Sequence, residues 1–247
     1  MGKKILRGVD LEIPDGEIHA LLGPNGSGKS VMMMTIMGYP EYEVLSGSIV
    51  FNGRNITRLP IDERARLGIG ISEQHPPEIK EVKLRNLINS MPLANDLKDK
   101  RNIRLGSTIR IGRFLDRGIN HGLSGGESKQ AELFLLLLSN PNLLLLDEPD
   151  SGVDPEQLKL VGGMINSSLR NTPGAAPPGK GKAHRNGSPK AALISTHSAA
   201  ILEYLKVDKA HLMMNGKIKC SGEPLLMMTH IVNQGYDHCI SCLAPLK

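Results

Sequence analysis

The chain of 247 residues has few aromatic side chains: no tryptophan, three phenylalanines and four tyrosines. Single-stranded nucleic acids are bound largely by stacking their bases on such rings, so this scarcity leaves little stacking surface. The formal net charge of +5 comes from lysines and arginines scattered along the sequence, which is typical of a solvated basic surface that also suits anionic ligands. We therefore expect no nucleic acid partner.

Cysteines and long apolar runs are also scarce. Three cysteines in a chain of this length cannot form a disulfide framework, which agrees with a reducing compartment. The longest apolar runs, 133–138 and 143–146, are far shorter than the roughly 18 residues that span a bilayer. The first four residues lead into no hydrophobic signal core. We therefore expect a cytoplasmic protein without direct membrane insertion.

The apolar segments that are present alternate between strand and helix patterns. A strand from Leu11 is predicted to reach a turn at 14–16, and a short apolar strand over 17–22 then leads through a glycine-rich loop into an apolar helix. Further strands are predicted over 47–51 and 67–71. Residues 143–146 and 192–195 are typical of buried parallel strands, because polar residues do not alternate with apolar ones. This alternation predicts an α/β fold with a mostly parallel sheet.

Two segments depart from this pattern. Residues 76–122 are polar and rich in lysine, arginine and asparagine, which indicates a helical subdomain inserted into a sheet core formed by 1–75 and 123–247. Residues 171–190 contain four prolines and four glycines without apolar periodicity. They bury too little surface to order themselves and are expected to form a flexible loop. The chain 1–247 is thus predicted to be one domain.

The glycine-rich loop carries the strongest chemical signal. Its spacing fits a P-loop, in which backbone N–H groups curl around phosphate oxygens at the N-terminus of a helix. Lys29 would neutralise the β- and γ-phosphates, and the Ser30 hydroxyl would bind Mg²⁺. Its place between a predicted strand and a predicted helix makes the pattern specific. The loop consists of Gly23, Pro24, Asn25, Gly26, Ser27, Gly28, Lys29 and Ser30.

Two acidic residues follow the leucine strand over 143–146. A buried strand that ends in Asp147 would place this carboxylate near the Mg²⁺ ion, and Glu148 could hold the attacking water. In isolation such a pair is usually a solvated turn or a helix cap. A P-loop in the same chain favours the catalytic interpretation.

A second candidate anion site begins at Ser124. Ser124 and Glu127 have the spacing of a capping box before an apolar helix, which alone would be a structural feature. That interpretation does not explain Gly125 and Gly126 between them. Two glycines leave backbone N–H groups bare at a helix start, where they can meet a phosphate.

The order of these motifs resembles the nucleotide-binding domain of ABC ATPases over essentially the whole chain. The P-loop, Gln74, the Ser124 motif, Asp147-Glu148, Asp154 and His197 follow one another as in that family. The resemblance implies a RecA-like core, ATP hydrolysis with Mg²⁺, a Gln74 that senses Mg²⁺ and nucleotide, and a His197 that contacts the γ-phosphate. Without it, His197 would be read as a surface histidine.

The resemblance also implies an assembly. Two such domains would form a nucleotide-dependent, head-to-tail homodimer that sandwiches two ATP molecules. Residues of one subunit would then contact the ATP that the opposite subunit holds. The residues implied for this contact are Ser124, Gly125, Gly126, Glu127 and Asp154.

Finer agreements resemble the SufC-type ATPases of iron–sulfur cluster assembly. They include Tyr39-Pro40-Glu41, Pro77-Glu78-Ile79 and the sequence from Asp150 to Asp154. The resemblance implies a scaffold partner similar to SufB or SufD, docked at residues 74–80 with Ile79 as an apolar anchor. The alternatives are the ATP-binding subunit of an ABC membrane transporter and an ABC module acting on nucleic acid or ribosomes. The latter usually has two ATPase domains, and this chain has one P-loop.

Several features depart from these families. The aromatic residue that usually stacks on adenine does not precede the P-loop, so base selectivity is an open question, and Gln130 stands where many family members have arginine. Cys239 and Cys242 beside His238 are half of a metal site, which would need Cys220 or a second subunit to complete it. An exposed pair without function is the simpler interpretation.

Overall fold

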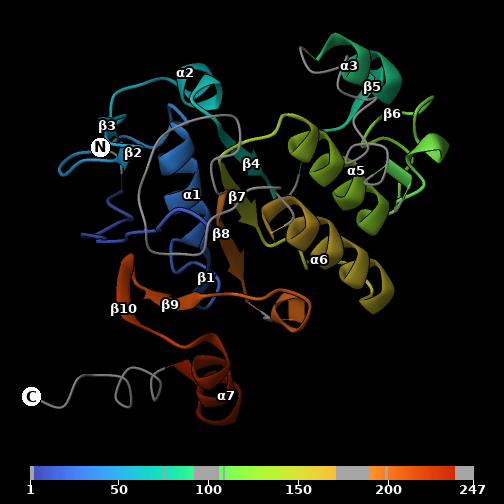
Figure 1. Ribbon diagram of the computed structural model, residues 1–247. Coiled ribbons are helices and arrows are strands. Elements are labelled where there is room, and N and C mark those ends of the chain that lie inside the picture. Colours follow the sequence, from blue (N-terminus) through green and yellow to red (C-terminus); the bar gives the residue numbers. More distant parts are fainter. Residues whose placement is uncertain are drawn as a thin grey trace, which may run out of the picture.

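The computed structural model describes residues 3–74, 76–91, 106–107, 109–170, 190–197 and 200–236. Its centre is a six-stranded sheet in the order β10-β9-β1-β8-β7-β4, flanked by helices (Figure 1). Neighbouring strands are parallel except β10 against β9, so the predicted α/β fold is confirmed. The strands are β1 (Ile18–Leu22), β4 (Ile69–Ser72), β7 (Leu143–Asp147), β8 (Ala191–Thr196), β9 (Lys209–Met214) and β10 (Lys217–Gly222). The helices around them include α1 (Lys29–Met37), α2 (Ile61–Arg66), α5 (Gly125–Leu138), α6 (Pro155–Arg170), the short η3 (Ala200–Glu203) and α7 (Pro224–Gln234).

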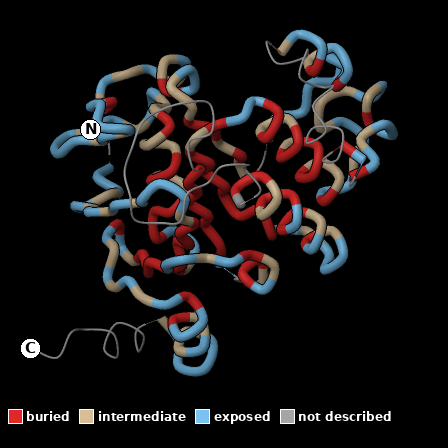
Figure 2. The backbone as a smooth tube through the Cα atoms, in the orientation of Figure 1, coloured by how far each residue is buried: buried red, intermediate tan, exposed pale blue. Residues whose placement is uncertain are grey.

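The sheet is apolar on both faces because side chains alternate along each strand. In β7, Leu144 and Leu146 pack into the core that contains residues of α5 and α6. Leu143 and Leu145 pack on the opposite face, in the core that contains residues of α1. Buried residues accordingly run through the middle of the molecule (Figure 2). The two-sided burial explains why the leucine run shows no polar alternation.

The segment before β1 is irregular, so the predicted strand from Leu11 is wrong. Leu11 and Ile13 pack against the α1 side of the core without joining the sheet. One backbone hydrogen bond, from Arg7 N to Gly216 O at 2.9 Å, ties this segment to the turn between β9 and β10. A single bond of this kind does not make a strand, which needs a repeating ladder.

The strand predicted over 47–51 is confirmed only at its end. It is β2 (Val50–Phe51), paired antiparallel with β3 (Arg54–Asn55). Asn52 and Gly53 between them have φ of 49° and 76°, as expected for the tight turn that an Asn-Gly pair favours. The strand predicted over 67–71 is β4, shifted by a residue or two.

The inserted segment 76–122, predicted to be a helical subdomain, contains two short strands as well as helices. β5 (Ile79–Lys83) pairs antiparallel with β6 (Gly118–Ile119), and α3 (Leu84–Ser90) and the short η2 (Ile111–Arg113) accompany them. All five residues of β5 are exposed, so the strand has no apolar face for a sequence pattern to reveal. The division into a core of 1–75 and 123–247 with an insertion at 76–122 remains a proposal.

Two predictions fall wholly or mostly outside the described residues. They concern the flexible loop over 171–190, of which only Lys190 is described, and the cysteine pair near the C-terminus. Within the described ranges, no helix is both long enough and apolar enough to cross a membrane.

Candidate functional site

Three glycines shape the loop between β1 and α1. Gly23, Gly26 and Gly28 have φ of 148°, 76° and 109°, and a Cβ on Gly23 would lie 2.2 Å from the carbonyl oxygen of Met213. Such backbone angles and such a close approach favour glycine. Gly28 caps α1 without a side-chain hydrogen bond, and the first turn holds no acidic residue. The free N–H groups of this helix start are therefore open to an anion.

Lys29 folds back onto this loop. Its Nζ donates to the carbonyl oxygens of Gly23 at 2.8 Å and Pro24 at 3.2 Å, and the residue is 4% exposed. Burial lowers the pKa of Lys29, while nearby carboxylates, Glu148 first, oppose that change. Ser27 Oγ is buried without a hydrogen-bond partner among the described residues, which leaves a polar atom for a ligand to satisfy.

The carboxyl end of β7 presents two buried carboxylates that β8 holds in place. Asp147 Oδ1 accepts a hydrogen bond from Ser195 Oγ at 2.5 Å, and Asp150 Oδ2 accepts one from Thr196 Oγ1 at 2.7 Å. β8 lies beside β7, with Ser195 in register with Asp147. The sequence analysis missed Ser195 and Thr196, whose signal was two polar residues at the end of an apolar strand.

Glu148 is the point at which the predicted catalytic residues meet. Its Oε2 accepts a hydrogen bond from Gln74 Nε2 at 2.7 Å and lies 3.3 Å from His197 Nδ1. Its Oε1 lies 3.9 Å from Lys29 Nζ. Glu148 also has a φ of 46°, which is uncommon for a residue other than glycine and frequent at functional sites. Three segments far apart in sequence thus converge on the Glu148 carboxylate.

The predicted capping box forms at the start of α5. Ser124 Oγ accepts from the Glu127 backbone N at 3.3 Å, and Ser124 N donates to Glu127 Oε2 at 3.0 Å. Gly126 is buried, and a Cβ there would lie 1.3 Å from Gln157 Oε1 of α6. Close packing of α5 on α6 therefore accounts for Gly126. Gly125 is exposed.

The residues implied to contact a second subunit lie at the starts of α5 and α6. Asp154 accepts from Gln157 N at 2.9 Å and thereby caps α6, just as Ser124 caps α5. Both helices pack on the sheet face opposite α1, and Figure 1 shows them well separated from it. Within one described chain, these contacts do not bring Ser124 or Asp154 to Lys29.

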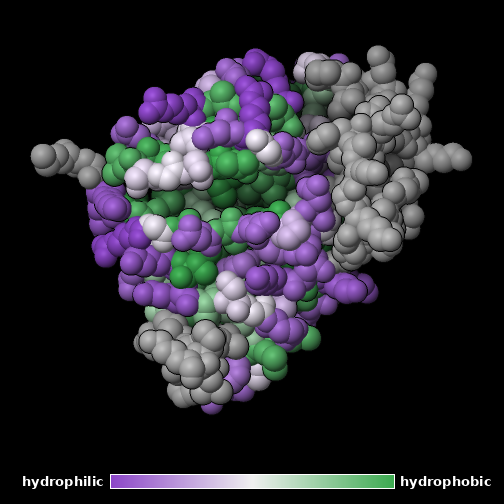
Figure 3. All heavy atoms as spheres, turned by 60° about the vertical axis from the view of Figure 1, so that its left-hand side comes forward, coloured by the Kyte–Doolittle hydropathy of each residue, from purple (hydrophilic) through white to green (hydrophobic). Residues whose placement is uncertain are grey.

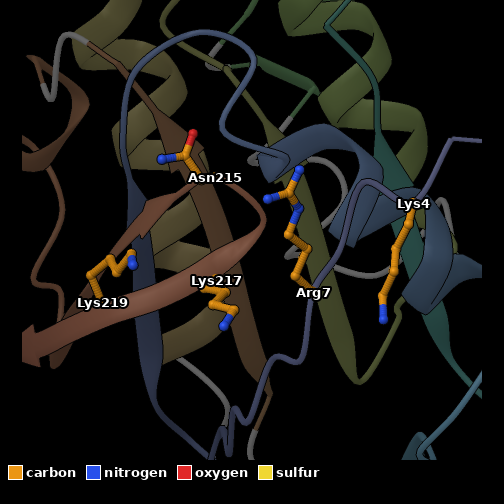
Figure 4. Close-up of a pocket in the computed structure, with 5 residues that line it drawn as sticks. All are labelled: Lys4, Arg7, Asn215, Lys217 and Lys219. Carbon is orange, nitrogen blue, oxygen red and sulfur yellow. The ribbon is translucent and has the colours of Figure 1, made fainter.

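A basic hollow lies next to the loop that precedes α1. Its volume is about 490 Å³, and Figure 4 shows its lining side chains around the start of β10 and the N-terminal segment. Gly216, in the adjoining turn, donates to Ser27 O at 2.9 Å. Figure 3 shows hydrophilic residues over much of this side of the molecule, with a band of hydrophobic residues between them. The lining residues are Lys4, Arg7, Asn215, Lys217 and Lys219.

The described ranges contain no cluster of three or more histidine, cysteine or acidic residues arranged to hold a metal ion. Cys220 is a partly buried cysteine on β10. Cys239, Cys242 and His238 lie outside the described residues, so the open question of a metal site there stays a hypothesis.

A strand, a glycine-rich loop and a helix that begins at a buried lysine, with carboxylates at the end of another parallel strand, define a P-loop nucleoside triphosphatase. The profile of the ABC transporter family matches residues 6–151. The chain belongs to the ATP-binding proteins of the ABC transporter family and is an ATPase of that family.

Relatives with this character align over nearly the whole chain. A probable ABC transporter ATP-binding protein of Streptococcus pyogenes is 37% identical over 245 residues, covering 95% of this chain and 89% of the relative. Vegetative protein 296 of Bacillus subtilis is 37% identical over 251 residues, covering 96% and 87%. A probable ATP-dependent transporter of Synechocystis is 34% identical over 248 residues, covering 96% and 90%.

Solved structures confirm the fold. A nucleotide-free ATP-binding cassette from an ABC transporter superposes with a TM-score of 0.72 at 24% identity, covering 97% of this chain and 94% of that one. At this identity the likeness concerns the fold alone, and it agrees with the ABC ATPase fold predicted from the motifs.

Proposed function

We propose that this chain hydrolyses Mg-ATP as a head-to-tail dimer and that the dimer drives iron–sulfur cluster assembly on a scaffold partner similar to SufB or SufD. The observation that carries the hydrolytic part is the convergence of Lys29, Gln74 and His197 on the Glu148 carboxylate. The assembly part rests on the SufC-like residues around Tyr39 and Ile79.

Each residue of the site has a separate task in this proposal. The backbone N–H groups at the start of α1 and the Lys29 ammonium bind phosphate oxygens. Glu148 orients the attacking water, because its carboxylate is a strong hydrogen-bond acceptor held at a fixed place. Gln74 and His197 hold that carboxylate and face the terminal phosphate.

The residues beside Lys29 fit a magnesium ion. Ser30 offers a hydroxyl, Asp147 a carboxylate and Gln74 an amide oxygen, and these hard oxygen donors are what Mg²⁺ prefers. Ser195 fixes one oxygen of Asp147 and so orients the other. When bound, the ion supplies positive charge that neutralises the phosphates.

The placement of α1 and α5 on opposite faces of the sheet supports the proposed dimer. Ser124 and Gly125 are exposed and lie on helices of the face opposite α1. In the proposed dimer, a second subunit presents them to a nucleotide on the P-loop. Ser124, Gly125, Gly126, Glu127 and Asp154 of one subunit would then complete the site of the other.

The proposed docking surface for the scaffold lies just beyond Gln74. Ile79 and Val82 on β5 are 40% and 37% exposed, and charged residues of the same strand surround them. A small apolar contact within a polar rim suits a partner that binds reversibly.

A pull-down with a purified SufB- or SufD-like scaffold tests the assembly proposal. Ile79→Asp should abolish capture and leave ATP binding unchanged, because Ile79 lies outside the phosphate site. Leu225→Asp is a matched control, since Leu225 is 67% exposed on α7, a helix that Figure 1 shows far from β5. Capture that survives Ile79→Asp, or fails equally in both variants, contradicts the docking surface.

The names of the relatives favour a second candidate, the ATP-binding subunit of a membrane transporter. In that case the surface beside Gln74 would accept a segment of an integral permease. Recovery of the native protein only in the membrane fraction, bound to such a permease, would replace the cluster-assembly proposal with this one.

A further inference from the structure

A partly buried polar cluster joins α5 to the segment that carries Gln74. It consists of Tyr39, Glu73, Lys129 and Glu132, and is called the Glu73 cluster below. Lys129 is 7% exposed. Burial lowers the pKa of Lys129 and raises that of Glu132. Buried ionisable groups are costly unless they are bonded, so the partners of these side chains indicate what they do.

Two side chains of α5 form hydrogen bonds with the backbone N–H and C=O groups of Glu73. Lys129 Nζ donates to Glu73 O at 2.5 Å, and Glu73 N donates to Glu132 Oε1 at 2.9 Å. Lys129 and Glu132 are three residues apart on the helix and therefore share one face. Glu73 is thus clamped to α5 through its main chain, which fixes its position more firmly than a side-chain contact would.

The residue that follows the C-terminal cap of α1 also holds Glu73. The Tyr39 hydroxyl donates to Glu73 Oε1, and Tyr39 directly follows Gly38, the C-terminal cap of α1. Burial and the hydrogen bond to Glu73 raise the pKa of Tyr39, so the hydroxyl stays protonated and remains a donor at neutral pH. The Glu73 cluster therefore connects the helix that follows the P-loop with the helix that begins at Ser124.

The Glu73 cluster is connected to Glu148 through one further residue, Gln74. Glu73 immediately precedes Gln74, whose Nε2 donates to Glu148 Oε2 at 2.7 Å. Lys129 and Glu132 belong to the continuous helix that Ser124 caps, and a helix moves largely as one body because its backbone hydrogen bonds run along its length. A displacement of the Ser124 end thus moves the main chain beside Gln74.

We propose that the Glu73 cluster positions Gln74, so that Lys129, Glu132 and Tyr39 are positioning residues that couple the placement of α5 to the Glu148 carboxylate. This inference rests on the roles proposed above for Gln74 and Glu148. The hydrogen bonds of the three positioning residues lead to Glu73 rather than to the phosphate site. Lys129 also interacts electrostatically with Asp147, Glu148 and Asp150, and the Gln74→Ala background separates that direct effect from the one that passes through Gln74.

Steady-state ATP hydrolysis by the full-length protein tests the coupling. Lys129→Met should lower kcat about tenfold, as the loss of one charge-assisted hydrogen bond permits, and change ATP affinity less than about twofold, since the P-loop is untouched. Lys159→Met, an exposed position on α6, should change neither quantity. In a Gln74→Ala background, Lys129→Met should lower kcat by less than about twofold, because the Gln74 side chain that Lys129 is proposed to position is already absent.

The outcomes separate this inference from the proposed function. If Lys129→Met reduces kcat by the same factor with and without Gln74→Ala, the coupling is overturned and hydrolysis stands. If Gln74→Ala hydrolyses ATP like the wild type, the route through Gln74 is overturned. A wild type that hydrolyses no ATP would overturn the hydrolytic proposal itself.

A milder variant keeps the test valid if Lys129→Met does not fold. Tyr39→Phe removes only the hydroxyl that binds Glu73. It should lower kcat about threefold in the wild type and leave kcat unchanged in the Gln74→Ala background. An equal reduction in both backgrounds would overturn the coupling.

Discussion

Gln74 donates a hydrogen bond to Glu148 across 2.7 Å, although 74 residues separate them in the chain. The register of two neighbouring strands produces this contact. β4 and β7 are parallel, and Ser72 is in register with Leu146, so that Gln74 and Glu148 each follow a paired residue by two positions. The sheet therefore places the amide and the carboxylate at one edge before any nucleotide is bound.

Lys29→Ala should lower the affinity for ATP about tenfold or more, because the phosphates lose a buried cation that takes part in charge-assisted hydrogen bonds. Titration with a fluorescent ATP analogue measures the change. Lys159→Ala removes an exposed lysine of α6 and should bind like the wild type. Equal affinity in Lys29→Ala and wild type would refute the assignment of the P-loop.

The Ser124 loop should act on the nucleotide of the other subunit. Ser124→Arg and Lys29→Ala should each be inactive alone, whereas a mixture should regain part of the ATPase activity. In a mixed dimer, the P-loop of the Ser124→Arg subunit faces the intact Ser124 loop of the Lys29→Ala subunit, which restores one complete site. Inactivity of every mixture, with mixed dimers demonstrated by native mass spectrometry, would contradict the head-to-tail arrangement.

Gly126→Ala should destabilise the fold by about 1–3 kcal/mol, the usual cost of overpacking. The added Cβ would lie 1.3 Å from Gln157 Oε1, so Gln157 would have to move. Chemical denaturation measures the change. Gln157→Ala frees the space, and the double variant should therefore show a smaller cost for Gly126→Ala than the wild-type background does. Additive losses would show that Gln157 does not exclude the side chain.

Acid should destabilise the fold through a pair of buried histidines. His211 Nε2 lies 3.0 Å from His19 Nδ1, and His211 Nδ1 lies 2.7 Å from Ser221 Oγ. Burial first, and then the His19 charge, lower the pKa of His211 from 6.5 to about 4. The folded state thus favours neutral His211. This contribution is complete above pH 6.5 and is lost as the pH falls toward 4.

Thermal melts between pH 7 and pH 4.5 check this sign. The Tm of the wild type should fall over this range more steeply than that of His211→Gln, which has no ring to protonate. His121→Gln, which removes an exposed histidine, should retain the wild-type slope. The same slope in His211→Gln and wild type would mean that His211 contributes nothing to the acid sensitivity.

The sequence predicted best what local spacing determines. The P-loop between β1 and α1, the leucine strand β7 and the capping box at Ser124 each follow from residues close together in the chain. The exposed strand β5 escaped prediction, because its five residues face solvent and form no apolar pattern. The prediction of a strand from Leu11 was wrong for the opposite reason. These residues pack apolar side chains against the core, as a strand would, but their backbone does not pair with the sheet.

Contacts that depend on how the strands and helices pack together could not be predicted from the sequence. Nothing in the spacing shows that Ser195 fixes Asp147 or that Lys129 reaches the carbonyl oxygen of Glu73. Both are polar residues beside a recognisable motif rather than within it. Their partners become neighbours only when β8 lies beside β7 and when α5 packs over the end of β4.

The most direct test of the catalytic assignment is single-turnover hydrolysis of ATP by Glu148→Gln. Glutamine keeps the size of the side chain but loses the charge that orients water, so the variant should bind ATP as tightly as the wild type. Its hydrolysis rate should fall by about a hundredfold or more. Wild-type hydrolysis by Glu148→Gln, with its ATP binding confirmed, would contradict the central claim that the site converges on this carboxylate to perform the reaction.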